Sequence, residues 1–256
     1  MTIRKGEPWG APGTLAEGSP VVDGDRALAR KLEELLTEEA LTEPVAGTAA
    51  GTAAEPVAGP VTEVPDQPAQ DQRAEPVGGA AEVGHPVEIG LLGGDLHKSV
   101  GAPSHSASDL FDGCGVRLPI DVGVVEFEDH GVQVRRLFVA HLVARVGRTG
   151  GLWSGRTAIV MNGSFIGTAN LGPKAHPNDG RLDVVDGRLS LGDRRKARPR
   201  MATGTHVPHP SLVELRVKRL VLSDDRPFRV RVDGESVGSA GELTIRCVPD
   251  AAVIVV

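Results

Sequence analysis

The sequence predicts a mainly β protein whose folded part is an antiparallel sandwich or barrel-like domain. Short apolar runs recur from residue 86 to the C-terminus, and many alternate with charged residues. Turn-forming pairs such as Asp-Gly separate several of these runs. The 256 residues include 33 Gly and 19 Pro, and only 3% are aromatic, so the core must consist mainly of Val, Leu, Ile and Ala. These features favour many short strands over a helical bundle.

Residues 1–42 are expected to form an N-terminal arm and a helix. The first 20 residues are rich in Gly and Pro, and Trp9 either pins this arm to the core or is exposed. Residues 21–41 have the periodicity of a helix, and Asp23 is suited to cap its start. The apolar face of that helix consists of Leu28, Leu32, Leu35 and Leu36.

Residues 43–85 are expected to be a disordered acidic insert. The segment Glu-Pro-Val-Ala-Gly occurs at 43–47 and 55–59, and Glu-Pro-Val-Gly-Gly occurs at 75–79. Acidic residues outnumber the single base, Arg73, and Ala, Gly, Pro and Thr fill much of the remainder. This composition buries too little apolar surface to offset the entropy lost on ordering.

Residues 86–256 are expected to fold. A strand, a Gly-rich turn and a short helical stretch come first, and a hairpin turned at 128–131 follows. Two more hairpins are expected, one turned at Asp186-Gly187 and one at 224–226. The last of these hairpins would carry basic residues on a face exposed to water.

Bulk features exclude some classes of protein. No run of 18 apolar residues is present, so the sequence predicts no membrane span. Because no apolar run follows the basic residues at the start, we expect no secretory signal and a cytoplasmic location. The two cysteines, Cys114 and Cys247, fit a reduced compartment, although a single disulfide stays open.

The order of motifs in the C-terminal part resembles the bacterial diacylglycerol kinase and sphingosine kinase-like lipid kinases. A strand ends in Asn162, an aromatic residue and a Gly turn follow at 165–167, and a Pro-x-Ala pair lies at 173–175. Asp-Gly-Arg-Leu-Asp then occupies 179–183, and Asp-Gly-Glu occupies 233–235. A weaker match places Asp95 and Lys98 at the Asp and Arg of the family's Asn-Asp-Phe-Ala-Arg segment.

The resemblance implies two domains, with an α/β domain that binds ATP preceding the β-domain. It implies that Glu235 is the catalytic general base, which removes the proton of a lipid hydroxyl. It also implies that Asp95 and Asn162 line the cofactor site. A structural Mg²⁺ would be held by the Asp179 carboxylate and by backbone oxygens of His176 and Arg181, because Mg²⁺ prefers oxygen ligands.

The sequence departs from this family in its nucleotide-binding half. The family's Gly-Gly-Asp-Gly-Thr loop is absent, and Gly93-Gly94-Asp95 continues into Leu96-His97. Residues 1–85 are also fewer than a complete α/β domain requires. We therefore expect only a vestigial α/β segment, and ATP binding is in doubt because no phosphate-binding loop is evident.

Simpler roles remain open for the same residues. Asp179 could serve only its turn, because Asn-Asp-Gly turns need no metal, and Glu235 could be an ordinary hairpin residue. Basic side chains would attract anionic lipid headgroups or merely be solvated. The basic residues concerned are Arg188, Arg194, Arg195, Lys196, Arg198, Arg200, Arg216, Lys218, Arg219, Arg229 and Arg231.

The preferred hypothesis is a lipid-kinase-like pseudokinase, which has lost ATP-dependent phosphotransfer and binds a lipid, an anionic headgroup or a protein partner. Peripheral membrane contact would be compatible with this hypothesis. The alternative is an active, divergent lipid kinase, a phosphotransferase with Glu235 as its base. A third hypothesis is an interaction module with a basic face. Nucleic acid is not expected as a partner, because aromatic residues that could stack on bases are few.

Overall fold

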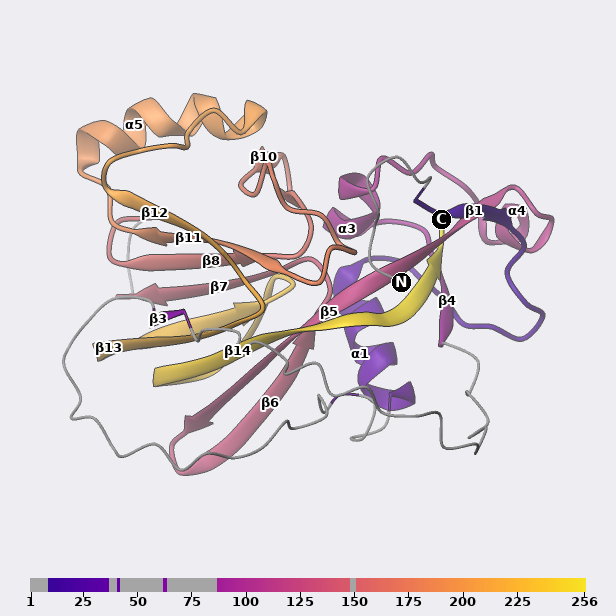
Figure 1. Ribbon diagram of the computed structural model, residues 1–256, viewed down its shortest axis with the longest axis horizontal. Coiled ribbons are helices and arrows are strands. Elements are labelled where there is room, and N and C mark those ends of the chain that lie inside the picture. Colours follow the sequence, from indigo (N-terminus) through magenta and orange to yellow (C-terminus); the bar gives the residue numbers. More distant parts are fainter. Residues whose placement is uncertain (1–8, 37–40, 42–61, 64–86, 148–150) are drawn as a thin grey trace, which may run out of the picture.

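The computed structural model describes residues 9–36, 41, 62–63, 87–147 and 151–256 (Figure 1). The expected disordered insert at 43–85 therefore lies outside the described residues, except for Thr62–Glu63. The first eight residues of the expected N-terminal arm lie outside them as well.

The described residues form the following elements. The helices are α1 (Asp25–Leu35), α3 (Gly94–Ser99), α4 (Ala107–Phe111), α5 (Leu191–Arg200) and the 3-10 turn η1 (Met201–Thr203). The strands of the first half are β1 (Ala11–Gly13), β2 (Val21–Val22), β3 (Thr62–Glu63), β4 (Glu88–Leu91), β5 (Gly115–Asp129), β6 (Val132–Phe138) and β7 (His141–Val146). Those of the second half are β8 (Thr157–Met161), β9 (Phe165–Ile166), β10 (Ala169–Asn170), β11 (Leu182–Gly187), β12 (Leu212–Val217), β13 (Arg219–Val232) and β14 (Glu235–Val255).

One large, mainly antiparallel sheet dominates the molecule, which confirms the predicted fold class. Its strand order is β1-β5-β14-β13-β7-β8-β11-β12, and the path does not close on itself. The long strands β5 and β14 run from this sheet into the N-terminal part of the molecule (Figure 1). They therefore connect the β-domain to the elements near the N-terminus.

The N-terminal part is a small α/β unit. Strand β4 pairs in parallel with both β2 and β14, and α1 lies between β2 and β4 in the chain. Leu28 and Leu32 of α1 are fully buried in a cluster that includes Ile89 of β4 and Ile120 of β5. This packing fixes α1 beside the sheet. The expected apolar face was only partly right, because Leu35 is 42% exposed and Leu36 lies beyond the helix as its C-cap.

The expected helix cap was wrong. Gly24 is the N-cap of α1 and no side chain caps this end, whereas Asp23 is exposed. The carboxylate of Asp25 instead accepts hydrogen bonds from Asp95 N (2.6 Å) and Leu96 N (3.0 Å), at the start of α3. Asp25 therefore joins the two helices, a long-range contact that local sequence rules do not reveal.

One of the three expected hairpins is confirmed and two are wrong. Strands β5 and β6 turn at His130 and Gly131, both of which have positive φ. Strand β11 instead runs through Gly187 and pairs with β12 after the α5 segment. Strand β13 continues through 224–226, with an irregular register in its pairing with β14.

Arg156 explains both errors. Its guanidinium pairs with the buried Asp186 at 2.9 Å and with Asp224 at 3.3 Å. It also donates to the backbone oxygen of Ser223. Acidic residues that resemble turn signals in sequence are thus held inside strands by one partly buried cation.

Candidate functional site at the Asp-Gly-Glu turn

The Asp-Gly-Glu motif forms the tight turn between β13 and β14. Asp233 and Gly234 have φ values of 44° and 80°, so both lie in the left-handed region. Two-residue hairpin turns of this kind favour Asp or Asn followed by Gly. Local backbone geometry alone thus accounts for the first two residues of the motif, and Glu235 follows as the first residue of β14.

Asp233 fixes this turn against the connection between β6 and β7. Its buried carboxylate accepts hydrogen bonds from the backbone N–H groups of Val139 (2.9 Å), Ala140 (3.0 Å) and His141 (2.9 Å). Burial raises the pKa of Asp233 to about 7, and the nearby Asp25 carboxylate also raises it. Asp233 is therefore a structural anchor for the residue that the sequence singled out, Glu235.

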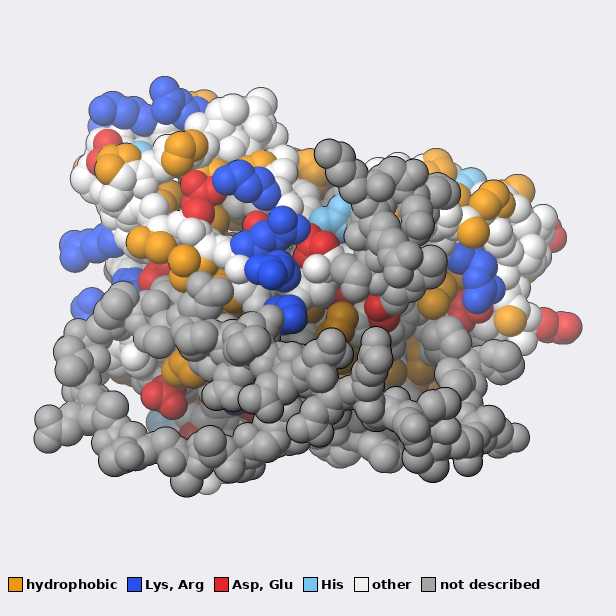
Figure 2. Space-filling model, viewed as in Figure 1, with side chains coloured by type: hydrophobic (Ala, Val, Ile, Leu, Met, Phe, Trp, Pro, Cys, Tyr) orange, Lys and Arg blue, Asp and Glu red, His pale blue; other side chains and the backbone are white. Residues whose placement is uncertain are grey.

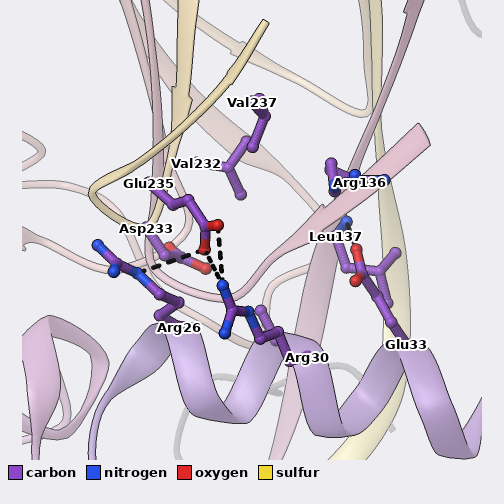
Figure 3. A pocket seen from close by; sticks show the side chains of 10 residues that line it. Arg26, Arg30, Glu33, Arg136, Leu137, Val232, Asp233, Glu235 and Val237 are labelled. Carbon is purple, nitrogen blue, oxygen red and sulfur yellow. Dashed lines mark hydrogen bonds and ion pairs between the residues drawn. The ribbon is translucent and has the colours of Figure 1, made fainter. Parts of the chain in front are cut away.

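Glu235 is held by two arginines of α1 (Figure 3). Arg30 Nη2 donates to both carboxylate oxygens, at 2.8 and 2.9 Å. Arg26 Nε lies 3.5 Å from Oε2. Arg26 and Arg30 are four residues apart, so they project from the same face of the helix.

A cavity of about 300 Å³ surrounds these side chains. Arg136 of β6 adds a third guanidinium to its wall, and Glu33 of α1 adds a second exposed carboxylate. Glu33 Oε1 accepts a hydrogen bond from Leu137 N at 2.9 Å. Figure 3 shows the acidic and basic groups along one side of α1. The walls can therefore bind a polar or anionic group more readily than an apolar one.

Asp95 lies close to this region through its contact with His141. Asp95 Oδ1 accepts a hydrogen bond from Gly167 N at 2.8 Å, and Oδ2 lies 3.6 Å from His141 Nδ1. Lys98 donates to Gly167 O at 2.8 Å and lies over the Phe165 ring, 4.5 Å from its centre. The two residues therefore hold the 165–167 turn against α3.

His141 is a buried group that sequence reasoning missed. Its pKa falls to about 4, chiefly because burial disfavours the charged ring, although Asp95 opposes this shift and Arg231 adds to it. A histidine at the start of the apolar run 141–146 was the only sequence signal for this position. Because its pKa is lowered, the His141 ring is neutral at pH 7.

Asn162 is fully buried and its amide cross-links two backbone segments. Its Nδ2 group donates to Asp121 O at 2.9 Å and to Val139 O at 2.8 Å. Its backbone N–H donates to Ala140 O at 2.9 Å. Because Asp233 binds the N–H groups of residues 139–141, Asn162 and Asp233 hold the same connection from two sides. The motifs thus meet at residues 139–141, which no motif included.

The expected metal residues gather at a second turn. Asp179 Oδ1 accepts a hydrogen bond from Arg181 N at 3.0 Å, and Oδ2 forms an ion pair with Arg216. Arg216 Nε also lies 3.8 Å from Asp183 Oδ2. Within the described residues, no group of three or more His, Cys, Asp or Glu side chains is arranged to hold a metal ion. A guanidinium already neutralises the Asp179 carboxylate, so these contacts do not fit a Mg²⁺ site.

His176 and Trp9 pack together at the same turn. Their ring centres lie 4.5 Å apart, and His176 Nδ1 accepts a hydrogen bond from Asn178 N at 3.2 Å. Burial lowers the pKa of His176. Trp9 also donates to Pro119 O at 3.4 Å, so it pins the arm to the core, one of the two roles expected for it.

Asp121 connects the two turns. Its carboxylate accepts hydrogen bonds from Gly180 N (2.6 Å) and Asp250 N (2.9 Å), while its backbone oxygen binds Asn162. Burial raises the pKa of Asp121 to about 7. No sequence pattern indicated this role, because Asp121 lies within an apolar strand.

Carboxylates occupy the position where a phosphate-binding loop would be expected. Asp23 and Gly24 lie between β2 and α1, in the strand–turn–helix order in which backbone N–H groups bind phosphate. Here Asp25 follows, and its carboxylate accepts hydrogen bonds from the backbone N–H groups at the start of α3. Burial raises the pKa of Asp25 to about 6. The acidic groups at this position do not fit a nucleotide phosphate.

Comparison with known proteins identifies the C-terminal half. Residues 132–256 match the family model described as the YegS C-terminal NAD kinase beta sandwich-like domain. Among curated proteins, none matches the sequence. No helix of the described residues is long and apolar enough to cross a membrane.

Three similar crystal structures are described as diacylglycerol kinases from Bacillus anthracis str. Sterne, two of them provisionally. The first has a TM-score of 0.50 at 12% identity, over 65% of this chain and 68% of that chain. The others have TM-scores of 0.47 and 0.44 at 12% and 14% identity, over 65% of this chain and 68% and 66% of theirs. At such identities the likeness shows the fold alone. The match of residues 132–256 to the YegS-type domain confirms the predicted resemblance to the diacylglycerol kinase-like lipid kinases.

Proposed function

We propose that this chain is a lipid-kinase-like protein that has lost ATP-dependent phosphotransfer and binds a lipid or an anionic headgroup. The observation that carries this proposal is the engagement of Glu235 by Arg30. Both carboxylate oxygens accept hydrogen bonds from one guanidinium, and Arg26 adds a further positive charge. In this structure the residue expected to be the base is thus paired with α1.

A general base must reach the proton that it removes, either directly or through one water molecule. For Glu235 to do so, Arg30 would have to rotate away and leave a carboxylate that is about one third exposed. Arg30 is itself exposed on α1, so the ion pair is weak in water and serves mainly to position Glu235. This arrangement favours recognition over proton transfer.

The part of the chain that corresponds to the family's nucleotide-binding domain gives independent support for the loss of activity. The short unit of β2, α1, β4 and α3 has no Gly-Gly-Asp-Gly-Thr loop. Asp25 supplies a carboxylate to N–H groups at the start of α3, and exposed Asp23 adds negative charge nearby. A triphosphate would meet repulsion here rather than a set of free N–H donors.

The basic surface supports binding of an anionic headgroup. Figure 2 shows Lys and Arg side chains gathered over α5. This helix exposes Arg195, Lys196, Arg198 and Arg200, and Leu191 at its start is 61% exposed. Clustered basic residues beside an exposed apolar one suit a peripheral contact with anionic lipids.

The proposal can be tested by calorimetry of ATP with Mg²⁺ on the purified chain. We expect no binding up to millimolar ATP and no phosphorylation of a diacylglycerol mixture. Glu235→Gln serves as the paired variant, because it keeps the shape of the side chain and removes its basicity. ATP binding with turnover that is lost in Glu235→Gln would contradict the proposal.

That contradicting result would instead establish the alternative, an active divergent lipid kinase. The feature that favours this alternative is the polar cavity of about 300 Å³ beside Glu235, which could admit a hydroxyl group. The interaction-module hypothesis predicts affinity for neither nucleotide nor lipid. Titration with lipid vesicles, neutral and anionic, separates it from the preferred proposal.

A further inference from the structure

The face shared by β7 and β13 holds an unusual set of arginines. In the antiparallel register, Arg145 of β7 lies directly opposite Arg229 of β13. Arg231 follows two residues later and so points to the same face. Like charges directly opposite each other destabilise a sheet pair, so this arrangement is unfavourable unless an anion offsets it.

These three arginines line one cavity of about 500 Å³, larger than the cavity beside Glu235. Among the described residues that line it, none carries a carboxylate. Val143, Leu152 and Ile166 form an apolar part of its wall. This arginine pocket, as we call it, thus combines a cationic region with an apolar one.

Two of the arginines, Arg229 and Arg231, keep much of their binding capacity available. Arg231 Nη2 donates to Gly234 O at 2.6 Å, and Arg145 Nη1 lies 3.5 Å from Gly151 O. In the described part of the chain, no acidic side chain forms an ion pair with Arg229 or Arg231. Both residues are exposed, so a ligand can reach them from solvent.

His141 lies at the buried end of the pocket. Its ring is neutral at pH 7, as described above, and its Nδ1 atom has no hydrogen-bond partner. The Oδ2 atom of Asp95 lies 3.6 Å from that ring nitrogen, and Asp95 Oδ1 accepts a hydrogen bond from Gly167 N. The pocket therefore has a polar, uncharged end below its arginines.

We propose that the arginine pocket binds the phosphate monoester headgroup of an amphiphile, with the alkyl chain against Val143, Leu152 and Ile166. A phosphate monoester presents three terminal oxygens, which can accept hydrogen bonds from several guanidinium groups at once. The inference rests on the proposed function and specifies the headgroup. It also assigns binding to β7 and β13 rather than to Glu235.

The test is calorimetry of the full chain with dodecyl phosphate below its micelle concentration. The comparison ligands are 1-dodecanoyl glycerol, which has the same chain length without the charge, and inorganic phosphate, which has the charge without the chain. The pocket variant is Arg229→Gln, and Arg229→Lys keeps the charge. Arg219→Gln is the matched control, because Arg219 is an exposed residue of the same strand that does not line the pocket.

We expect dodecyl phosphate to bind more tightly than either comparison ligand. Arg229→Gln should weaken its binding by roughly tenfold, as expected for a lost hydrogen bond to a charged group. Arg229→Lys should weaken it less, and Arg219→Gln should leave it unchanged. Thermal unfolding checks that each variant is folded.

Two outcomes would overturn the inference and leave the proposed headgroup binding intact. In the first, the wild type and Arg229→Gln bind dodecyl phosphate equally well. In the second, inorganic phosphate binds as tightly as dodecyl phosphate, which would remove the role of the apolar wall. Absence of binding to all three ligands would instead contradict both the pocket and the headgroup part of the proposed function.

Discussion

At the scale of single residues, the Asp-Gly-Glu motif divides into two roles. Asp233 is buried and binds three backbone N–H groups, whereas Glu235 is partly exposed and pairs with Arg26 and Arg30. The first role requires an acceptor with no access to water, and the second requires a charge at the surface. Substitutions at the two positions should consequently affect different properties.

Asp233→Ala is expected to destabilise the fold. It would leave the N–H groups of residues 139–141 buried without their acceptor, at a cost of about 1–3 kcal/mol for each unsatisfied group. Asp233→Asn keeps an amide oxygen and should cost less. Urea unfolding at pH 7 measures both, with exposed Asp225→Ala as the control. Equal stability of the Ala and Asn variants would contradict this role.

Asp121 should make stability depend on pH. Burial raises its pKa in the folded state to about 7, from an ordinary value of 3.8. The folded state therefore retains a proton that the unfolded state releases between about pH 4 and pH 7, so this contribution to stability falls as pH rises. The uncharged Asp121→Asn variant lacks the contribution.

The free energy of unfolding of the wild type, minus that of Asp121→Asn, should thus decrease from pH 4 to pH 7 and then level off. Denaturant titrations of the two proteins at a series of pH values measure this difference. Taking the difference cancels the opposite contributions of buried histidines such as His141, whose pKa is lowered. A difference that stays constant with pH would show that Asp121 ionises normally.

At the scale of elements, the hairpin of β5 and β6 depends on a glycine. Gly123 lies opposite Phe138 in the register, and a methyl group added there would overlap the Phe138 ring. Phe138 is fully buried in the main core, so it has little room to move. The glycine therefore lets the aromatic ring cross the strand.

Gly123→Ala is expected to lower the free energy of unfolding by about 1–3 kcal/mol, the usual cost of overpacking a core. Gly151→Ala is the matched control, because an added methyl group there would meet no atom within 4 Å. Thermal or urea unfolding of both variants measures the effect. Equal stability of the two variants would mean that Phe138 shifts freely.

At the scale of the whole molecule, arginine side chains form ion pairs that join distant segments of the chain. Arg156 joins Asp186 and Asp224, and Arg216 joins Asp179 and Asp183. Arg216 thus neutralises the turn where the family resemblance implied Mg²⁺. The fold should consequently keep its stability without a divalent ion.

Chelation should leave the Tm of the wild type unchanged, and millimolar Mg²⁺ should not raise it. Arg216→Ala leaves Asp179 and Asp183 without their shared cation, so its Tm should fall and should rise again when Mg²⁺ is added. Thermal scans with EDTA and with Mg²⁺ measure both proteins. A fall in the Tm of the wild type on chelation would support the metal site that the resemblance implied.

The elements with strong local signals were predictable from sequence. Each of these signals depends on residues that are close together in the chain. They are the periodic leucines of α1, the turn at 130–131 and the ordered motifs of the β-domain. The errors came from acidic residues that resemble turns. Asp186 lies inside a strand because Arg156, 30 residues earlier in the chain, offsets its burial.

The candidate site was only partly predictable. Asp95, Asn162 and Glu235 were expected from motifs. Residues 139–141, which contact Asp95, Asn162 and Asp233, carry no motif. Arg26 and Arg30 appeared only as polar positions of a helix. Arg229 and Arg231 appeared only as residues of a solvated face, because the sequence does not show that Arg145 lies opposite Arg229.

The sequence by itself determined the mainly β architecture, the burial of Leu28 and Leu32 on α1 and the resemblance of the C-terminal part to lipid-kinase-like proteins. These properties follow from periodicity and from local motifs. Only the tertiary structure decided that Arg30 holds Glu235, that Asp25 binds the start of α3 and that three arginines share one pocket. The pairs Arg30–Glu235, Asp25–Asp95 and Arg145–Arg229 each join residues 70 or more positions apart. Their energies depend on burial and charge that exist only after the chain has folded.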